Sequence, residues 1–396
     1  MIRMIRLHGG AAAALALLLA LCGARASAED AEVTITVRLF RVKTAPFQKA
    51  LLNEKRHPLG MVFDRDAGAG LEALLKESAG QCVATAQAKQ APTISLNDLH
   101  TENIVRDMDL EIDANGVRGD PVKGAFTWGL ALRATGVERD DAGNVKMTLT
   151  GSACLPHEER RTTKTEGGNV DLPGCATLGG SIPLVVPPGG SVIMGASDLE
   201  DPAHTVVLVI GSHVTPAPPA AKAATGARGL ALWWLDMPGK DADAIVKAAL
   251  RPPAISPEQA DRAREAKARF WAFVPTWGPA IELDVLSQQA IVADYDEETA
   301  AGRTAWDPII GGYEESIHIR LEGTTIKVDV EVVDRPVAEK KAAGGKKSVA
   351  DPARVSATAG SELPQDAGAQ DWLLPVRNPL GIQLGALLVS ARAQDR

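Results

Sequence analysis

The feature that most constrains the fold of this chain is an internal duplication. Residues 92–136 align without a gap on residues 279–323, shifted by 187 positions, and 15 of the 45 aligned residues are identical. Unrelated segments would share about three. Arrays of stacked repeats have periods of about 20 to 50 residues, so this longer period predicts two copies of one larger unit. The shared residues are Pro92, Ile94, Leu96, Leu99, Ile104, Val105, Asp107, Asp109, Glu111, Ala114, Asp120, Pro121, Gly124, Arg133 and Gly136.

Each copy has the residue pattern of a β-rich unit. Val33–Leu39 alternates apolar and polar residues, which is typical of a strand with one buried face. Short apolar runs separated by Gly, Asp and Asn predict further strands at 130–134, 145–149, 182–186, 191–194, 205–210 and, in the second copy, 230–235. Amphipathic stretches predict short helices at 47–52, 71–75 and 242–250. We therefore expect a mainly β fold with short helices (α+β), formed by two tandem units.

The N-terminus has the three parts of a secretory signal peptide. Arg3 and Arg6 precede the apolar run Ala11–Cys22, and Ala26-Ser27-Ala28 predicts cleavage before Glu29. The alternative is an uncleaved anchor, but this run is shorter than the about 20 residues that cross a bilayer. We expect an exported protein, periplasmic or associated with the outer membrane. The predicted segments are a signal peptide at 1–28, a first unit at 29–214, a Pro-, Ala- and Gly-rich linker at 215–229 and a second unit at 230–396.

The charge of the chain limits its partners. Loss of Arg3, Arg6 and Arg25 with the signal peptide changes the formal net charge from −8 to −11. An acidic surface disfavours nucleic acid and anionic lipid, which both select basic proteins. No later segment has the length and apolarity of a membrane helix. The expected partners are therefore proteins of an envelope or secretion complex. Self-association and contact with the outer membrane are compatible with this charge as well.

Three cysteines remain after the predicted cleavage. A bridge between Cys154 and Cys175 would close the polar segment between them and stabilise the unit by about 3 kcal/mol. Cys82 would then be single. We expect it to be buried as a small apolar residue, and the alternative is an exposed thiol that pairs between chains.

Both copies contain a polar excursion at the same stage of the repeat. The first is Pro156–Gly174, and the second is Glu339–Asp371 with the lysine run Lys340–Lys347. Low hydrophobicity and high charge predict mobile, solvated loop tips. We therefore expect His157 in the first excursion to be solvated.

Several stretches resemble the C-terminal domain of secretins, the ring-forming outer-membrane proteins of type II and type III secretion systems. The opening strand Val33–Val42, the Pro-led strand at Pro92–Ile94 and the strand Val185–Ala196 with its Gly pair follow in the order of that domain. Thr205–Ile210, with the following 213–216, is similar to its closing strand. The resemblance covers most of 33–216 and, more faintly, 229–391. It implies a duplicated, divergent secretin-like fold.

The resemblance implies a non-enzymatic protein of a secretion-type assembly. Secretins place a longer segment between the Gly pair and the closing strand, whereas here Ala196 is only nine residues from Thr205. We therefore expect a fold kept for association through edge strands and excursions. One alternative is a minimal pore-forming subunit, which short strands would disfavour because strands that span a bilayer need about 9 to 11 residues. The other is a periplasmic ligand-binding module unrelated to secretion.

Motifs of known chemistry are absent from the sequence. It lacks the His-Glu-x-x-His zinc motif, a Ser elbow between glycines and a phosphate-binding loop, and its seven histidines are scattered. We expect no catalytic, cofactor-binding or metal-ligating residues. The best candidate cluster is acidic, and we expect it to be structural or solubilising, with calcium binding as the alternative. Its members are Asp107, Asp109, Glu111, Asp294, Asp296, Glu297 and Glu298.

Tryptophans concentrate in the second copy. They are Trp233, Trp234, Trp271, Trp277, Trp306 and Trp372. Large aromatic side chains fill cores when buried and form ligand or protein contacts when exposed. In a domain rich in Ala and Val we expect core filling, with a carbohydrate- or peptide-binding platform as the alternative.

Overall fold

The computed structural model confirms a mainly β, α+β fold. It describes residues 32–51, 61–63, 67–215, 228–247, 254–277, 280–322, 325–333, 340–341, 347–348, 354–362, 370–377, 380 and 383–393. Four helices and a continuous 18-stranded antiparallel sheet lie within these residues, together with two short hairpins. The predicted signal peptide lies outside the described residues, as does most of the predicted linker. The linker positions that are described, Thr215, Arg228 and Gly229, belong to strands.

The two units repeat one order of elements. The first unit contains β1 (Glu32–Lys43), α2 (Thr44–Leu51), β2 (Val62–Phe63), α3 (Gly68–Glu77), β3 (Gln81–Lys89), β4 (Thr93–Asp113), β5 (Gly116–Arg139), β6 (Val145–Pro156), β7 (Arg161–Lys164), β8 (Asn169–Leu172), β9 (Gly174–Val186), β10 (Ser191–Ser197) and β11 (His204–Thr215). The second unit contains β12 (Arg228–Leu235), α4 (Gly239–Lys247), β13 (Ala254–Ile255), α5 (Pro257–Arg264), β14 (Ala268–Thr276), β15 (Ala280–Ala300), β16 (Arg303–Glu322), β17 (Thr325–Val333), β18 (Lys340–Lys341), β19 (Lys347–Ser348), β20 (Arg354–Glu362), β21 (Gln370–Arg377) and β22 (Gln383–Ala393). Strand pairings recur as well: β1 pairs with β3 and β11, and β12 pairs with β14 and β22.

The long hairpins β4–β5 and β15–β16 repeat each other residue by residue. Thr93 lies opposite Thr135, and 187 residues later Ala280 lies opposite Glu322. The same shift relates every pair along the two hairpins. It also relates their β-bulges, which lie between Val105 and Asp107 in one and between Val292 and Asp294 in the other. The shift that aligns the sequences is therefore the shift that aligns the registers.

The strands form two layers with a common core. The long-strand layer has the order β4-β5-β6-β9-β15-β16-β17-β20. The second layer contains β3-β1-β11-β10 and β14-β12-β22-β21, joined where β10 pairs with β14. Alternate residues of β1, from Val33 to Leu39, are buried in the core between the layers. This core contains residues of both units, so each unit completes the other.

Residues of all four described helices pack on the other face of the second layer. Phe47 of α2 and Leu71 of α3 pack with Trp271 and Phe273 of β14 in a second buried cluster. Because both faces of this layer are buried, β11 has a continuous apolar run rather than an alternating one. The helices near 47–52, 71–75 and 242–250 were predicted. α5 was not, although Ser256 and Gln259 form a capping box at its start.

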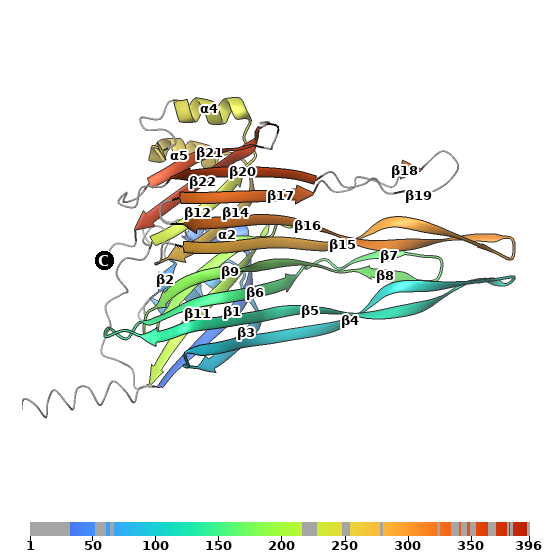
Figure 1. Ribbon diagram of the computed structural model, residues 1–396, viewed down its shortest axis with the longest axis horizontal. Coiled ribbons are helices and arrows are strands. Elements are labelled where there is room, and N and C mark those ends of the chain that lie inside the picture. Colours follow the sequence, from blue (N-terminus) through green and yellow to red (C-terminus); the bar gives the residue numbers. More distant parts are fainter. Residues whose placement is uncertain are drawn as a thin grey trace, which may run out of the picture.

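The hairpin strands are much longer than the sequence suggested. β4, β5, β15 and β16 have 21, 24, 21 and 20 residues, and the hairpins project from the packed body to one side (Figure 1). The expectation of short strands is therefore wrong, and strand length does not argue against the pore-forming alternative. No helix among the described residues has the length and apolarity needed to cross a membrane.

The first polar excursion is folded, contrary to expectation. Its strands β7 and β8 pair with each other, and Val170 is fully buried. The loop between them lies against the β4–β5 hairpin: a Cβ placed on Gly119 would be 2.7 Å from the Cα of Gly167. Asp171 accepts a hydrogen bond from the amide of Val105 at the bulge, at 2.8 Å. In the second excursion, β18 pairs with β19 and β20 belongs to the long-strand layer, while most of the remaining residues lie outside the described part.

Candidate functional site at the junction of the two units

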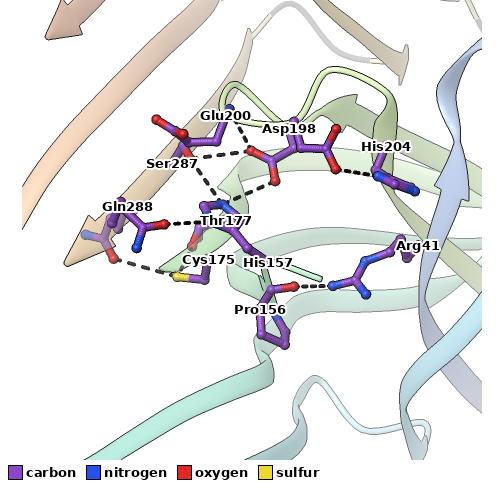
Figure 2. Close-up of polar contacts among 12 residues, drawn as sticks. Arg41, Pro156, His157, Cys175, Thr177, Asp198, Glu200, His204, Ser287 and Gln288 are labelled. Carbon is purple, nitrogen blue, oxygen red and sulfur yellow. Dashed lines mark hydrogen bonds and ion pairs between the residues drawn. The ribbon is translucent and has the colours of Figure 1, made fainter. Parts of the chain in front are cut away.

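A buried polar cluster joins the two units (Figure 2). His157 follows β6, Asp198 follows β10, and Ser287 and Gln289 belong to β15 of the second unit. The His157 and Asp198 side chains are each 9% exposed, and His157 Nε2 lies 3.2 Å from Asp198 Oδ2. The expectation that His157 is solvated is therefore wrong. Because His157 directly follows β6, its side chain points into the junction rather than into solvent.

Gln289 and Asp198 together favour a protonated His157. The Gln289 Nε2 atom donates to the carbonyl oxygens of Leu172 and Ala290 at 2.8 and 3.0 Å. Its Oε1 atom must then face His157 Nδ1, at 3.1 Å, and can only accept. His157 Nε2 faces a carboxylate, which also accepts. Both ring nitrogens therefore carry a proton, and the side chain is an imidazolium.

The two charges of the pair sustain each other. Burial opposes the charged form of His157, but the hydrogen bond and the negative charge of Asp198 outweigh it and raise the pKa of the imidazolium. Burial likewise opposes the charge of Asp198, and the bond from His157 outweighs it and lowers the pKa of the carboxyl. The amide of Glu200 also donates to Asp198 Oδ1 at 2.9 Å. The result is a buried ion pair between strands.

Ser287, His157 and Asp198 are the three residue types of a Ser-His-Asp triad, but they do not have the geometry of one. The Ser287 Oγ lies 3.4 Å from His157 Nε2 and 3.4 Å from Asp198 Oδ1, so Ser287 and Asp198 share one ring nitrogen. A triad needs the acid and the serine on opposite ring nitrogens and a neutral histidine that accepts the serine proton. The imidazolium has no free lone pair, and Ser287 is 0% exposed. This arrangement holds charge and does not activate a nucleophile.

Neighbouring contacts fasten the same junction. Arg41 of β1 donates to the carbonyl oxygen of Pro156, next to His157. Ser197 precedes Asp198, and its Oγ accepts from the amide of Trp271 in β14 at 2.9 Å. Side chains at the end of β10 thus bind strands of the second unit in both layers. The cluster positions the units relative to each other.

Two free thiols lie beside the ion pair. Cys154 lies opposite Thr177 and Cys175 opposite Pro156, so the thiols are diagonal neighbours on β6 and β9, and they share a hydrogen bond without a disulfide. That bond, opposed by burial and supported by a hydrogen bond with Thr177 and by the His157 charge, lowers the pKa of Cys175 to about 7. The hydrogen bond with Cys175, together with burial, raises the pKa of Cys154. The bridge that the sequence allowed between these two cysteines is thus not formed. The expectation of a buried Cys82 is also wrong, since it is exposed.

The acidic residues of the repeat lie on the projecting hairpins. Asp107, Asp109 and Glu111 alternate along the outer part of β4, and Asp109 lies opposite Asp120 of β5. Asp109, Glu111, Asp296 and Glu297 are exposed, whereas the side chains of Asp294 and Glu298 lie outside the described part. Within the described chain, no three His, Cys, Asp or Glu side chains are grouped as metal ligands would be. The structure therefore offers no described ligand set for the calcium alternative.

The tryptophans of the second unit are mostly core residues. Trp233, Trp234, Trp271 and Trp372 are between 1% and 4% exposed, and Trp277 packs partly buried against the core between the layers. Core filling is confirmed for the first four, and they are not available as a binding platform. The side chain of Trp306 lies outside the described part.

Comparison with known proteins does not place this chain in a family. No family model, no curated protein and no solved structure matches it.

Proposed function

We propose that this protein is a non-enzymatic structural component of an exported, secretion-type envelope assembly, in which it contacts other protein subunits. The observation that carries the proposal is the duplicated architecture. The two units share one sheet, and a long hairpin of each unit projects from the packed body (Figure 1). Exposed strand edges and extended hairpins are surfaces that bind other chains by strand pairing. The secretin-like order of strands in the sequence supports the choice of a secretion-type assembly.

The buried junction supports a structural role rather than an enzymatic one. His157, Asp198 and Ser287 are the residues in the described chain that most resemble a catalytic set, and they are buried between strands with the histidine protonated. A general base must be neutral and must reach its substrate. These side chains satisfy each other instead.

Secretome analysis tests the proposed function. A strain that lacks this chain should retain specific exported proteins in the periplasm and lose them from the medium. The wild-type gene should restore their release. A secretome identical to that of the parent strain, with unchanged envelope complexes, would contradict the proposal.

A minimal pore-forming subunit is the second candidate, favoured by the 20- to 24-residue hairpin strands. These strands exceed the about 9 to 11 residues that cross a bilayer. The two candidates differ in one measurement. Ion conductance in liposomes that contain the purified chain would select the pore, and the structural component should bind its partners without conducting.

A further inference from the structure

In the long-strand layer, the two units are joined by one strand pairing. The strands that correspond to this pair lie at the two outer edges of the long-strand layer, and among the described pairings they are not joined to each other. Inside the chain, β9 of the first unit pairs with β15 of the second, from Ser181 opposite Glu282 to Gly174 opposite Gln289. β9 is the last strand of its unit in the long-strand layer, and β15 is the first. The corresponding last and first strands at the outer ends are β20 and β4.

The outer strands have few backbone partners along the relevant length, and the Asp98 side chain of β4 accepts a hydrogen bond from the Thr85 amide of β3 at 2.6 Å. Among the described pairings, β4 pairs with β5 alone. β20 pairs with β17 along nine positions and with β21 at the single position Thr358, opposite Arg377. The long-strand layer of one chain thus ends in two edges that match the two edges joined at its centre.

The repeat specifies a register for joining these edges. Subtracting 187 from a residue number in β15 gives the corresponding residue of β4, because Ile281 opposite Leu321 repeats Ile94 opposite Ala134. Adding 179 to a residue number in β9 gives the corresponding residue of β20, because Lys327 opposite Gly360 repeats Thr150 opposite Ser181. Transferred by these shifts, the internal junction places Ser95 opposite Gly360, Leu96 opposite Ala359, Asn97 opposite Thr358, Asp98 opposite Ala357, Leu99 opposite Ser356, His100 opposite Val355 and Thr101 opposite Arg354.

An exposed leucine lies in the middle of this edge. Leu99 is 54% exposed, and few large apolar side chains in the described chain are as open to solvent. Its counterpart Leu286 lies in the internal junction opposite Thr177 and is partly covered there. Joining β20 to β4 would cover Leu99 in the same way. Burial of apolar surface of this kind favours association.

The second layer has a matching arrangement. Inside the chain, β10 pairs with β14 at Gly195 opposite Phe273 and Ala196 opposite Ala272. The counterparts of these strands at the outer ends are β21 and β3, and β3 pairs with β1 alone among the described pairings. Both layers can therefore continue from one chain into the next.

We propose that the chain binds a second copy of itself head to tail, with 354–360 of β20 pairing with 95–101 of β4 in the partner copy in the register of the internal β9–β15 junction. The inference rests on the proposed function and deepens it by naming the partner. The single bridge at Thr358 is exchanged when the copies join. Such an interface is heterologous, so it generates a closed ring or an open filament rather than a symmetric dimer.

Cysteine cross-linking between two single variants tests the direction and the register. In a background with the exposed Cys82 replaced by Ser, Leu99→Cys protein is mixed with Ser356→Cys protein and oxidised. Opposite positions on paired strands bring Cβ atoms to about 4.5–5.5 Å, close enough for a bridge after small adjustments. We expect a cross-linked dimer from the mixture and none from either variant alone. The double variant should give a ladder of multimers.

The matched control shifts one cysteine by an odd number of positions. In the pair Leu99→Cys and Ala359→Cys, the second thiol projects from the opposite face of the strand, so no dimer should form. Equal cross-linking of both pairs would contradict the register. Dimers from Leu99→Cys alone would show two β4 edges facing each other and would overturn the head-to-tail geometry.

A solution measurement avoids engineered thiols. By sedimentation velocity, Leu99→Lys should weaken self-association about tenfold or more, because a charge on an edge opposes pairing. Ile309→Lys is the control, since Ile309 is 42% exposed on β16 and lies outside the edge. A monomeric wild-type chain that still restores secretion would overturn self-association and leave the proposed function standing. Self-association of a chain whose loss has no effect on secretion would overturn the proposed function and leave self-association standing.

Discussion

At the scale of single residues, the junction depends on one buried imidazolium. An isolated buried charge costs several kcal/mol, and the charge of His157 is sustained by Asp198 on one side and the fixed amide of Gln289 on the other. Such a pair adds little net stability over well-packed apolar residues. Breaking it leaves an uncompensated charge, which gives each member a large individual effect. The pair therefore specifies how the units meet more than it increases the free energy of unfolding.

We predict that Asp198→Asn lowers the free energy of unfolding by about 3 kcal/mol near pH 6, because it leaves His157 without a counter-ion. Urea denaturation measures the change. Asp201→Asn is the matched control: Asp201 pairs with His204, but its side chain is 43% exposed, and surface pairs contribute about 0–1 kcal/mol. Equal losses in both variants would show that the buried pair has no special weight.

The pair also predicts a dependence of stability on pH. The folded-state pKa of His157 is raised above 6.5, so its contribution is complete below pH 6.5 and is lost as the pH rises through the folded-state value. The folded-state pKa of Asp198 is lowered below 3.8, so its contribution is complete above pH 3.8 and is lost as the pH falls through the folded-state value. The pair is thus fully effective between these limits.

Between pH 6.5 and 9, we expect the wild-type chain to lose stability and the His157→Gln variant to lose much less. Glutamine keeps a donor toward Asp198 but does not titrate. Chemical denaturation at a series of pH values gives the two curves. Parallel curves would mean that His157 is not charged in the folded chain.

The thiol pair makes a prediction about reactivity. The hydrogen bond from Cys154 lowers the pKa of Cys175 to about 7, so Cys154→Ala should raise it toward 9.0. The rate of iodoacetamide modification at Cys175 against pH, followed by mass spectrometry, reports this value. Cys82→Ser should leave the curve unchanged. A Cys175 curve unaffected by Cys154→Ala would exclude the shared proton.

At the scale of elements, close packing of glycines holds the β7–β8 loop on the first hairpin. A Cβ on Gly119 would meet Gly167 and the side chain of Met108 at 2.7 Å. We predict that Gly119→Val destabilises the chain by about 1–3 kcal/mol and increases hydrogen exchange in β7 and β8. Gly116→Val is the control, because nothing lies within 4 Å of a Cβ there. Unchanged exchange in β7 and β8 would show that the loop does not depend on this contact.

The sequence predicted most strands and helices but not their lengths. Alternation identified β1, and apolar runs identified β6, β10 and β11 within their observed bounds. An Asp-Pro dipeptide is common in turns, yet Asp120 and Pro121 both continue β5, where Pro121 lies opposite Met108 beyond the bulge. A proline at a position that donates no ladder hydrogen bond does not end a strand. Local residue types alone could not distinguish this case from a turn.

The buried junction could not be predicted for a different reason. His157 contacts Asp198 and Gln289, which are 41 and 132 residues away in sequence, so no motif spacing connects them. Its neighbours Glu158 and Glu159 are exposed, as expected for a polar segment. The only local signal was that His157 directly follows an apolar strand.

At the scale of the whole molecule, the shared sheet and core predict cooperative unfolding. Strands β9 and β15 pair along eight positions, and one core contains residues of both units. We expect one thermal transition, with a calorimetric enthalpy equal to the van't Hoff enthalpy. Two separate transitions would show that the units are independent domains joined by a linker.

The identical register of the two hairpins has a practical consequence for protein engineering. Segments 93–135 and 280–322 have equal length, the same turn position and the same bulge, so each presents the same backbone at its base. Segment 280–322 could replace segment 93–135 without a change of register in the flanking strands, and this direction of exchange leaves Ser287 and Gln289 in place at the junction. A chimera carrying two copies of a single hairpin would then isolate what the differing side chains of each arm contribute.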